Sequence, residues 1–437
     1  MFQNNGKKTI NMNKLFSFSL GCLAIILLTS CHPTHPFDLA AIDPGRYDAT
    51  WWNHTPLRFI QTNLSEMDGG MDVDVYVQSI VDASANFVLF NVGGIVANYP
   101  TKLPYHYRNP YLKGDLVGEA VKKLHDKGIR VIGRFDFSKI HETLASKKPD
   151  WLYVGTNGKH VNYNGQVHTC VNGGYQQEYG FEILKEAIEA YPLDAIFFNM
   201  GGYQTSDYSQ VDYGICQCEN CRKRFRAATG LTLPVKSDAN DPVFRQYREF
   251  QRSTSTELFS RIKSFIKNLN PNLVLVHEVG EIIRSESGTG FTSGRDWNYH
   301  ATENVKRVLG SYKDKPPNDS FNYLMGMDYR HTATSPNIGR IFLLEQMLNG
   351  AAPGIYVMGR LEHQYDRVFL PTLRELFGFH KANEKLFTNL QPISRVGLIM
   401  GASQDYRGIM KMLIEEHIMF DLIQTSAVGS AEIPRPL

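Results

Sequence analysis

Long apolar stretches and concentrated positive charge are both scarce in this sequence of 437 residues. The one marked apolar stretch runs from Leu15 to Leu28, which is shorter than the ~20 residues that a helix needs to cross a bilayer. The formal net charge is +2, and no basic run is longer than Arg222 to Arg224. We therefore expect no transmembrane segment after this stretch and no nucleic acid partner.

The first residues have the order of an export signal. A second possible start, Met12, precedes a lysine and then the apolar stretch. The stretch ends in Leu-Thr-Ser-Cys, which resembles the lipobox of bacterial lipoproteins, so Cys31 is the expected lipid attachment site. We predict a lipoprotein signal peptide over residues 1–31, a tether over residues 32–50, and export to the periplasmic face or the outer surface. An ordinary signal peptide with an incidental cysteine is the alternative.

The rest of the chain alternates short β-rich apolar runs with amphipathic helical stretches, which is typical of βα units around a parallel sheet. Its length and 42% hydrophobic content allow one large core and a small second domain. We predict a (β/α)8 TIM-type barrel over residues 51–390. Its sixth strand is uncertain, because it follows the fifth after a few residues, whereas parallel neighbours normally need a crossover of a dozen or more. The predicted strands are Leu57–Asn63, Phe87–Asn91, Arg130–Asp136, Ala195–Asn199, Leu273–His277, Ile282–Ser285, Tyr323–Met327 and Gly354–Met358.

A new unit is expected from residue 391 to the end of the sequence. It contains a predicted strand, Val396–Met400, and a predicted helix, Tyr406–Leu422. One βα step is the beginning of a doubly wound, flavodoxin-like domain, and it cannot bury its own apolar face. We therefore expect a truncated domain at residues 391–437, or else a step that packs on the barrel.

Four cysteines remain once Cys22 and Cys31 are set aside with the signal. Cys216, Cys218 and Cys221 fall within six residues, which suits three corners of a tetrahedral four-thiolate zinc site, and Cys170 is the expected fourth ligand. Two disulfides are the alternative in an exported protein, although such crowded thiols would form a strained local pair. We predict a structural zinc ion and no organic cofactor. Four thiolates leave no open position for catalytic water, so a zinc hydrolase is excluded.

The cysteine segments carry a family resemblance. Cys170-Val171-Asn172 and Cys216-x-Cys218-x-x-Cys221 are similar to the zinc-site segments of the β-galactosidases of glycoside hydrolase family 42. That resemblance implies a barrel followed by a flavodoxin-like trimerisation domain, and hence a homo-oligomer. Other segments resemble the family called hypothetical glycosyl hydrolase 6, among them Asn91–Ile95, Arg134–Lys139 and Arg284–Ser287. The two resemblances together imply a carbohydrate-active barrel.

Glycoside hydrolysis needs two carboxyl groups on opposite sides of the scissile bond, and barrel enzymes place such groups at the carboxyl ends of strands. Asp328 falls where the family 42 resemblance implies a strand-seven nucleophile, although it could instead order Arg330 or His331. At the end of strand four the resemblance implies a carboxylate, but this chain has Asn199. The candidates for the missing acid/base are Glu286 and Asp207, and Glu286 could instead be an ion-pair partner of Arg284. Asp136, at the end of strand three, is a further catalytic candidate.

These features predict a retaining glycoside hydrolase that releases terminal sugars from an oligosaccharide or polysaccharide. A β-galactoside is the first expectation for the substrate and an α-L-fucoside the second. The alternative is a degenerate barrel that binds carbohydrate without cleaving it, because an amide such as Asn199 cannot protonate a leaving group. The residues predicted to contact the sugar are Asn199, Glu278, His106, Trp297 and Arg134.

Overall fold

The computed structural model describes residues 50–428, apart from residues 289–296, 389, 391 and 402. The described residues all belong to the larger of two compact units, His35–Leu437. The predicted signal peptide, Cys31 and most of the tether lie outside them. None of the described helices combines the length and the apolar character that a membrane span requires.

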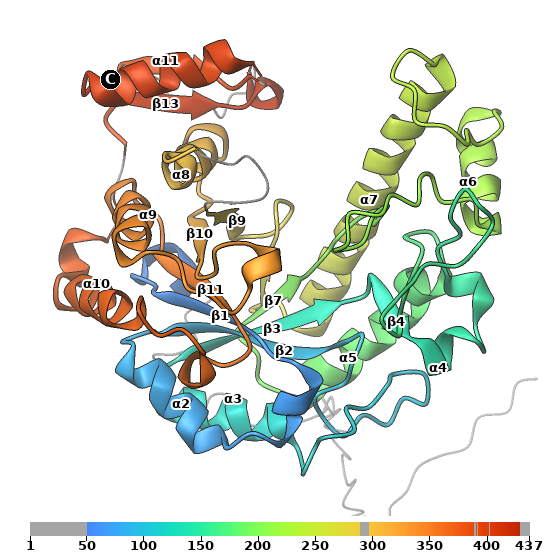
Figure 1. Ribbon diagram of the computed structural model, residues 1–437, viewed down its shortest axis with the longest axis horizontal. Coiled ribbons are helices and arrows are strands. Elements are labelled where there is room, and N and C mark those ends of the chain that lie inside the picture. Colours follow the sequence, from blue (N-terminus) through green and yellow to red (C-terminus); the bar gives the residue numbers. More distant parts are fainter. Residues whose placement is uncertain (1–49, 289–296, 389, 391, 402, 429–437) are drawn as a thin grey trace, which may run out of the picture. The chain divides into compact units, whose positions relative to one another are not determined.

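Eight parallel strands form one sheet in which the strands follow one another around a barrel (Figure 1). β1 pairs with both β2 and β11, so the first strand joins the last. The remaining junction, between β8 and β9, consists of one parallel bridge from Val276 to Ile282. The sheet is therefore a nearly closed barrel, as predicted. Its strands are β1 Phe59–Asn63, β2 Phe87–Gly94, β3 Arg130–Asp136, β7 Ala195–Phe198, β8 Val274–Val276, β9 Ile283–Ser287, β10 Pro317–Asn322 and β11 Gly354–Met358.

Alternation along the strands divides the core in two. Phe87 and Leu89 on β2 belong to an apolar cluster with the ends of β1, β3 and β8, inside the barrel. Their neighbours Val88 and Phe90 pack instead in the larger cluster that includes the surrounding helices. Successive side chains of a strand point to opposite faces, so every second residue of each strand points into the barrel interior.

Helices alternate with the strands and cover the outside of the barrel, except between β8 and β9, where six residues connect the strands directly. Several begin at an aspartate. Asp72, for example, accepts hydrogen bonds from the backbone N–H groups of Asp74 and Val75 at 2.9 and 3.2 Å. The main helices are α2 Val73–Asp82, α3 Leu116–Asp126, α5 Gly180–Ala190, α7 Pro242–Leu269, α8 His300–Ser311, α9 Pro336–Leu348 and α10 Leu370–Ala382.

The loop after β3 carries a small antiparallel sheet and leads toward the cysteine segment. Its strands are β4 Lys139–His141, β5 Asn162–Tyr163 and β6 Gln166–His168, in the order β4-β6-β5. An antiparallel bridge joins Val154 to His160 across the turn at Asn157-Gly158. Short helices complete this part of the chain: α1 Trp51–His54, α4 Glu142–Ala145, α6 Glu219–Thr229, the π-helix η5 Tyr175–Tyr179, and the 3-10 helices η3 Glu66–Gly70, η4 Pro149–Trp151, η6 Met327–Tyr329, η7 Leu361–His363, η8 Glu384–Leu386 and η9 Thr425–Ala427.

The prediction of strand seven at Tyr323–Met327 is wrong, because the strand is β10, Pro317–Asn322. β10 carries polar residues at alternate positions, Asn318, Ser320 and Asn322, so it lacks the apolar pattern that normally marks a buried strand. The more apolar run that follows contains Gly326, beyond which the chain turns into η6. Asp328 therefore lies six residues beyond the end of the strand instead of next to it.

The end of the described chain forms a βαβ unit: β12 Val396–Ile399, α11 Gln404–Glu415 and β13 Phe420–Ile423, with the two strands parallel. The predicted helix Tyr406–Leu422 is thus too long. His417, at φ 56°, follows the end of α11, and the last residues predicted as helical form a strand instead. A flavodoxin-like domain stays a prediction.

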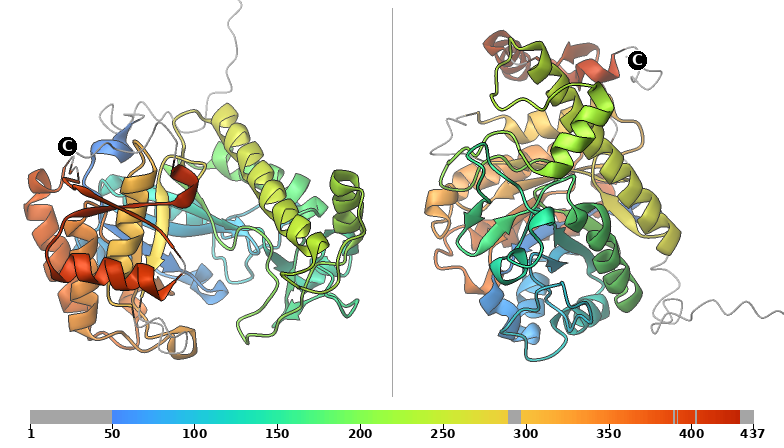
Figure 2. Two further views of the ribbon diagram at one scale, coloured as in Figure 1. Left: turned by 90° about the horizontal axis from the view of Figure 1, so that it is seen from above. Right: turned by 90° about the vertical axis from the view of Figure 1, so that its right-hand side faces the viewer.

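This βαβ unit packs on α8 (Figure 2). The Lys306 amino group donates to the carbonyl of Phe420 at 2.9 Å, and the N–H of Gln424 donates to the hydroxyl of Ser311 at 2.9 Å. Gly310 allows the close approach, because a Cβ at this position would lie 2.1 Å from the carbonyl oxygen of Leu422. The alternative that this segment packs on the barrel's elements is therefore confirmed.

A methyl group at Gly310 tests this contact. Gly310→Ala is expected to push β13 away from α8 and to destabilise the protein by about 1–3 kcal/mol, as other overpacking substitutions do. Thermal unfolding should show a lower Tm, and limited proteolysis should cleave more rapidly between residues 396 and 428. Gly378→Ala is the matched control: its Cβ meets no atom within 4 Å, and alanine favours the helix α10. Equal Tm values for the two variants would contradict the packing.

Candidate active site

A cavity of about 520 Å³ opens where the carboxyl ends of the barrel strands meet. Residues at or just beyond the ends of six barrel strands line it, and enzymes of this fold place their active sites at this end. Of the residues predicted to be functional, four contribute to this one cavity: Arg134, Asp136, Asn199 and Glu286.

Asp136 is the last residue of β3, and its side chain is 5% exposed. Its carboxylate accepts hydrogen bonds from the Ser138 backbone N–H at 3.0 Å, from the Ser138 hydroxyl, and from the Asn199 amide at 2.8 Å. The guanidinium of Arg134 lies 3.6 Å away. Three hydrogen bonds and the nearby guanidinium fix the orientation of this buried carboxylate.

Glu286, on β9, has a side chain that is 44% exposed. Its carboxylate lies 2.9 Å from the guanidinium of Arg284, whose side chain is only 6% exposed. Glu286 and Arg284 thus form an ion pair, and the role of Glu286 as acid/base stays a prediction. Arg284 also donates to Gln61 on β1, and its guanidinium lies 4.9 Å from the ring centre of Phe197.

The two carboxylates come from well-separated strands. In the barrel order, β3 and β9 have β7 and β8 between them on one side and four strands on the other. Asp136 and Glu286 therefore line the cavity from different sides. Glu66, at the start of η3 beyond β1, brings a third carboxyl group to the same cavity. This arrangement can place acidic groups around a bound molecule.

Several residues of the cavity went unnoticed in the sequence. Asn91 and Tyr356 occupy inward positions of β2 and β11, and Lys139 begins β4. The hydroxyl of Tyr356 and the side-chain oxygen of Asn91 are buried and have no hydrogen-bond partner among the described residues. Burial raises the pKa of Tyr356, so its hydroxyl keeps its proton. In the sequence, polar residues at every second position of a strand would have indicated side chains that point into such a cavity.

Asp328 and Glu278 lie elsewhere. Asp328 is exposed in η6, between Met327 and Arg330, which do line the cavity. Glu278 follows β8 and pairs with Arg307 at 3.3 Å. Neither carboxylate is among the lining residues.

His106 and Trp297 are both part of packed structure. His106 is 3% exposed, and its Nε2 accepts a hydrogen bond from the N–H of Gly94 at 3.0 Å. Burial lowers the pKa of His106 to about 3, so the ring is neutral. Trp297 packs in an apolar cluster with Tyr406 and Met410 of the C-terminal βαβ unit. The structure thus places these two predicted sugar contacts outside the lining of the cavity.

The four cysteines Cys170, Cys216, Cys218 and Cys221 form one buried cluster. Their sulfur atoms lie within 4.8 Å of one another, and the Sγ atom of Cys170 is 3.3 Å from that of Cys221 and 3.4 Å from that of Cys218. These separations exceed a disulfide bond of about 2.05 Å. The N–H groups of Asn172 and Cys221 point at two of the sulfurs, as donors do toward thiolates. The donor set fits a metal ion held by four thiolates.

The cysteine cluster supports one wall of the cavity. Cys170 follows β6, whose Gln166 lines the cavity, and Cys216 ends the loop that contributes Met200 and Tyr208. A separate small apolar core, including Tyr153, surrounds the sulfur atoms. The cluster thus joins the two loops within this apolar core.

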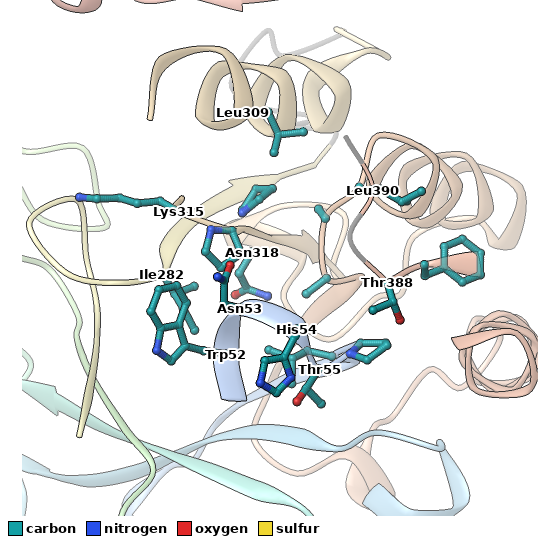
Figure 3. A pocket seen from close by; sticks show the side chains of 18 of the residues that line it. Trp52, Asn53, His54, Thr55, Ile282, Leu309, Lys315, Asn318, Thr388 and Leu390 are labelled. Carbon is teal, nitrogen blue, oxygen red and sulfur yellow. The ribbon is translucent and has the colours of Figure 1, made fainter. Parts of the chain in front are cut away.

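A second cavity, of about 550 Å³, lies at the amino ends of the strands and is shown in Figure 3. Trp52 and His54 of α1 and Asn318 of β10 are among its lining residues. Among the described residues that line it, Asp314 is the one carboxylic acid. A site that needs two acidic groups is therefore at the other end, where Asp136, Glu286 and Glu66 gather.

Acidic side chains that converge at the carboxyl ends of barrel strands are the arrangement found in barrel glycosidases. Residues 72–200 match the family described as Hypothetical glycosyl hydrolase 6, which confirms that resemblance. The matched region contains Arg134, Asp136 and Asn199, while Glu286 lies beyond it. No curated protein sequence matches this chain.

Solved structures of glycosidases share the fold. The α-L-fucosidase isoenzyme 2 of Paenibacillus thiaminolyticus superimposes with a TM-score of 0.68 at 18% identity, over 84% of this chain and 58% of its own. The β-galactosidase of Bacillus circulans sp. alkalophilus gives 0.57 at 15%, over 85% and 65%. The family 42 β-galactosidase Gan42B of G. stearothermophilus gives 0.62 at 13%, over 86% and 66%. This chain thus spans less than two thirds of each of these proteins, and the likeness establishes the TIM-barrel fold.

Proposed function

We propose that this protein is a retaining glycoside hydrolase that releases terminal sugars from glycans bound at the carboxyl end of the barrel. The observation that carries the proposal is that Asp136 and Glu286, from separate strands, line one cavity of about 520 Å³. That volume is in the range of small-molecule sites, roughly 300–1,000 Å³. Retention requires the two carboxyl groups to lie about 5–5.5 Å apart when the sugar is bound.

The environments of the two carboxylates suggest different roles. Asp136 is buried and held by three hydrogen bonds, which suits a carboxylate that stabilises, or bonds to, a positively charged anomeric centre. Glu286 is partly exposed to solvent, which suits a group that reaches both water and a leaving group as the acid/base. That role also requires Glu286 to leave its ion pair with Arg284.

The names of similar structures support two substrate classes. One neighbour is an α-L-fucosidase and two are β-galactosidases, so fucosides and galactosides are the first substrates to test. Identities of 18% or less make this a proposal about class and not about linkage.

The second candidate function is carbohydrate binding without cleavage. It is favoured by Asn199, which stands immediately after β7 where a carboxylate is expected and donates to Asp136. With that amide in place, the cavity relies on Glu286 and Glu66 for proton transfer.

Substitution of the carboxylates separates these hypotheses. With aryl β-galactosides and aryl α-L-fucosides, Asp136→Asn and Glu286→Gln should each reduce kcat/KM by at least about 100-fold, because each removes a group needed in the transition state. Glu119→Gln, on the exposed side of α3, is the control and should retain full activity. Asp328→Asn tests the prediction that Asp328 is the nucleophile. Loss of activity in this variant alone would identify Asp328, in η6, as that residue. Absence of turnover by the wild type, together with measurable glycan binding, would favour the second function.

We also propose that Cys170, Cys216, Cys218 and Cys221 hold a structural zinc ion. The support is the cluster of four buried sulfurs with N–H groups directed at them. The ion would connect the loop after β6 to the loop before α6, and all chemistry on the sugar would fall to the barrel residues.

Metal analysis tests the zinc proposal. The purified protein should contain about one zinc ion per chain, and Cys218→Ser should lose most of it with a lower Tm. Glu219→Ala alters the neighbouring side chain, which is 64% exposed, and should keep both the zinc and the Tm. Wild-type protein without bound metal, or equal metal content in the two variants, would contradict a thiolate site.

Membrane attachment through Cys31 remains a proposal that rests on the sequence alone. In an expressing bacterium, the wild type should fractionate with membranes and incorporate labelled palmitate, whereas Cys31→Ala should do neither. Cys22→Ala is the matched control, since this residue would leave with the signal peptide. Membrane association of Cys31→Ala equal to that of wild type would refute the anchor.

A further inference from the structure

Two cations of the candidate active site are buried without adequate partners. Lys139 is 4% exposed, and its amino group has one polar contact, the Ser138 hydroxyl at 3.4 Å. The Arg134 guanidinium makes no hydrogen bond to the described residues: its Nε is buried without a partner, and its approach to Asp136, at 3.6 Å, is too long for one.

The charges around the cavity do not balance. Three cations of the site, Arg134, Lys139 and Arg284, are buried or nearly buried. If the protein alone neutralised them, each would form an ion pair with a carboxylate. Asp136 and Glu286 are the carboxylates in ion pairs with these cations, at 3.6 and 2.9 Å. Lys139 has no ion pair among the described residues. Arg330 adds a fourth cation at the exposed rim, and Glu66 adds a third carboxylate.

A buried cation without a counter-charge is costly, which calls for an explanation of Lys139. Burial lowers the pKa of Lys139, while nearby Asp136 raises it. The amino group also lies 5.8 Å from the ring centre of Tyr208, at the outer limit of a cation–π contact, and such a contact does not neutralise the charge. Because Arg134 and Lys139 both line the cavity, a negatively charged group within the cavity can contact the two together.

We propose that the sugar bound in this cavity carries an oxyanion, the carboxylate of a uronic acid or a sulfate ester, and that Arg134 and Lys139 bind it. The inference rests on the proposed carbohydrate-binding function of the site. A planar guanidinium with free N–H groups suits the two oxygens of a carboxylate, and the ammonium group of Lys139 adds a point charge beside it. The orphaned Nε of Arg284 supplies a further buried donor next to the cavity.

Calorimetric titration of the full chain with paired monosaccharides tests the inference. The pairs are D-galacturonate with D-galactose and D-glucuronate with D-glucose, and D-galactose 6-sulfate is the sulfate-ester arm. At least one anionic sugar should bind at least about tenfold more tightly than its neutral partner, since charge-assisted hydrogen bonds to buried donors are strong. A preference for the sulfate ester over the uronates would identify the source of the oxyanion.

Two variants link that preference to the named cations. Lys139→Met and Arg134→Gln should each abolish most of the preference, measured as the ratio of the anionic to the neutral affinity within the same variant, because each removes one of the positive charges that would contact the oxyanion. Lys122→Met removes an exposed lysine of α3, 72% exposed in its side chain, and should retain the preference. Thermal unfolding verifies that each variant is folded, and either one alone suffices for the comparison.

The outcomes for this inference and for hydrolysis are separable because binding is measured without turnover. Equal affinity for anionic and neutral sugars, or a preference that survives in both variants, overturns the inference even if neutral aryl glycosides are cleaved. A preference that depends on Arg134 and Lys139 supports it even if no glycoside is hydrolysed, in which case the second candidate function stands.

Discussion

The alternation of side chains along eight strands of a closing barrel is the constraint on which the rest of the structure depends. Each inward position must share one interior with its counterparts on seven other strands. At the amino end this interior is filled by Phe59, Phe87 and Ile132. Toward the carboxyl end the same alternation brings Arg134 and Arg284 together above that apolar layer. The polar cavity is therefore a direct result of where apolar side chains stop along each strand.

The sequence was sufficient to predict most of the barrel, because most strands carry apolar side chains on both faces. β3 and β11 have the predicted bounds, and five other strands differ by one to three residues at an end. β10 differs because Asn318, Ser320 and Asn322 are polar although they lie on a buried strand. The helix α8 is not predicted from the sequence because no capping side chain marks its start. Its buried residues Ala301, Val305 and Val308 nevertheless repeat at helical spacing.

The site was predictable only where a residue ends a strand. Asp136, Asn199 and Glu286 come together because each lies at or next to the carboxyl end of an observed strand. Asp328 was placed by the predicted position of a strand that lies elsewhere in the structure, and its role as nucleophile stays a prediction. Lys139 lies in an inserted hairpin, and its contact with the cavity depends on a fold of that loop that no local pattern specifies.

Asn199 has a clear electrostatic role if Asp136 is the working carboxylate. An aspartate at position 199 would set two negative charges within hydrogen-bond distance, and one of them would hold a proton. The amide instead donates to Asp136 at 2.8 Å, so no second negative charge lies beside this carboxylate at position 199. Under the proposed function, the proton-transfer role would then fall to Glu286, which lines the cavity from another strand. If an acidic group of the substrate neutralises Arg134 and Lys139, hydrogen bonds from Ser138 and Asn199 still fix the orientation of the Asp136 carboxylate. The same buried donors can thus serve both the fixed carboxylate of the protein and an acidic group of the ligand.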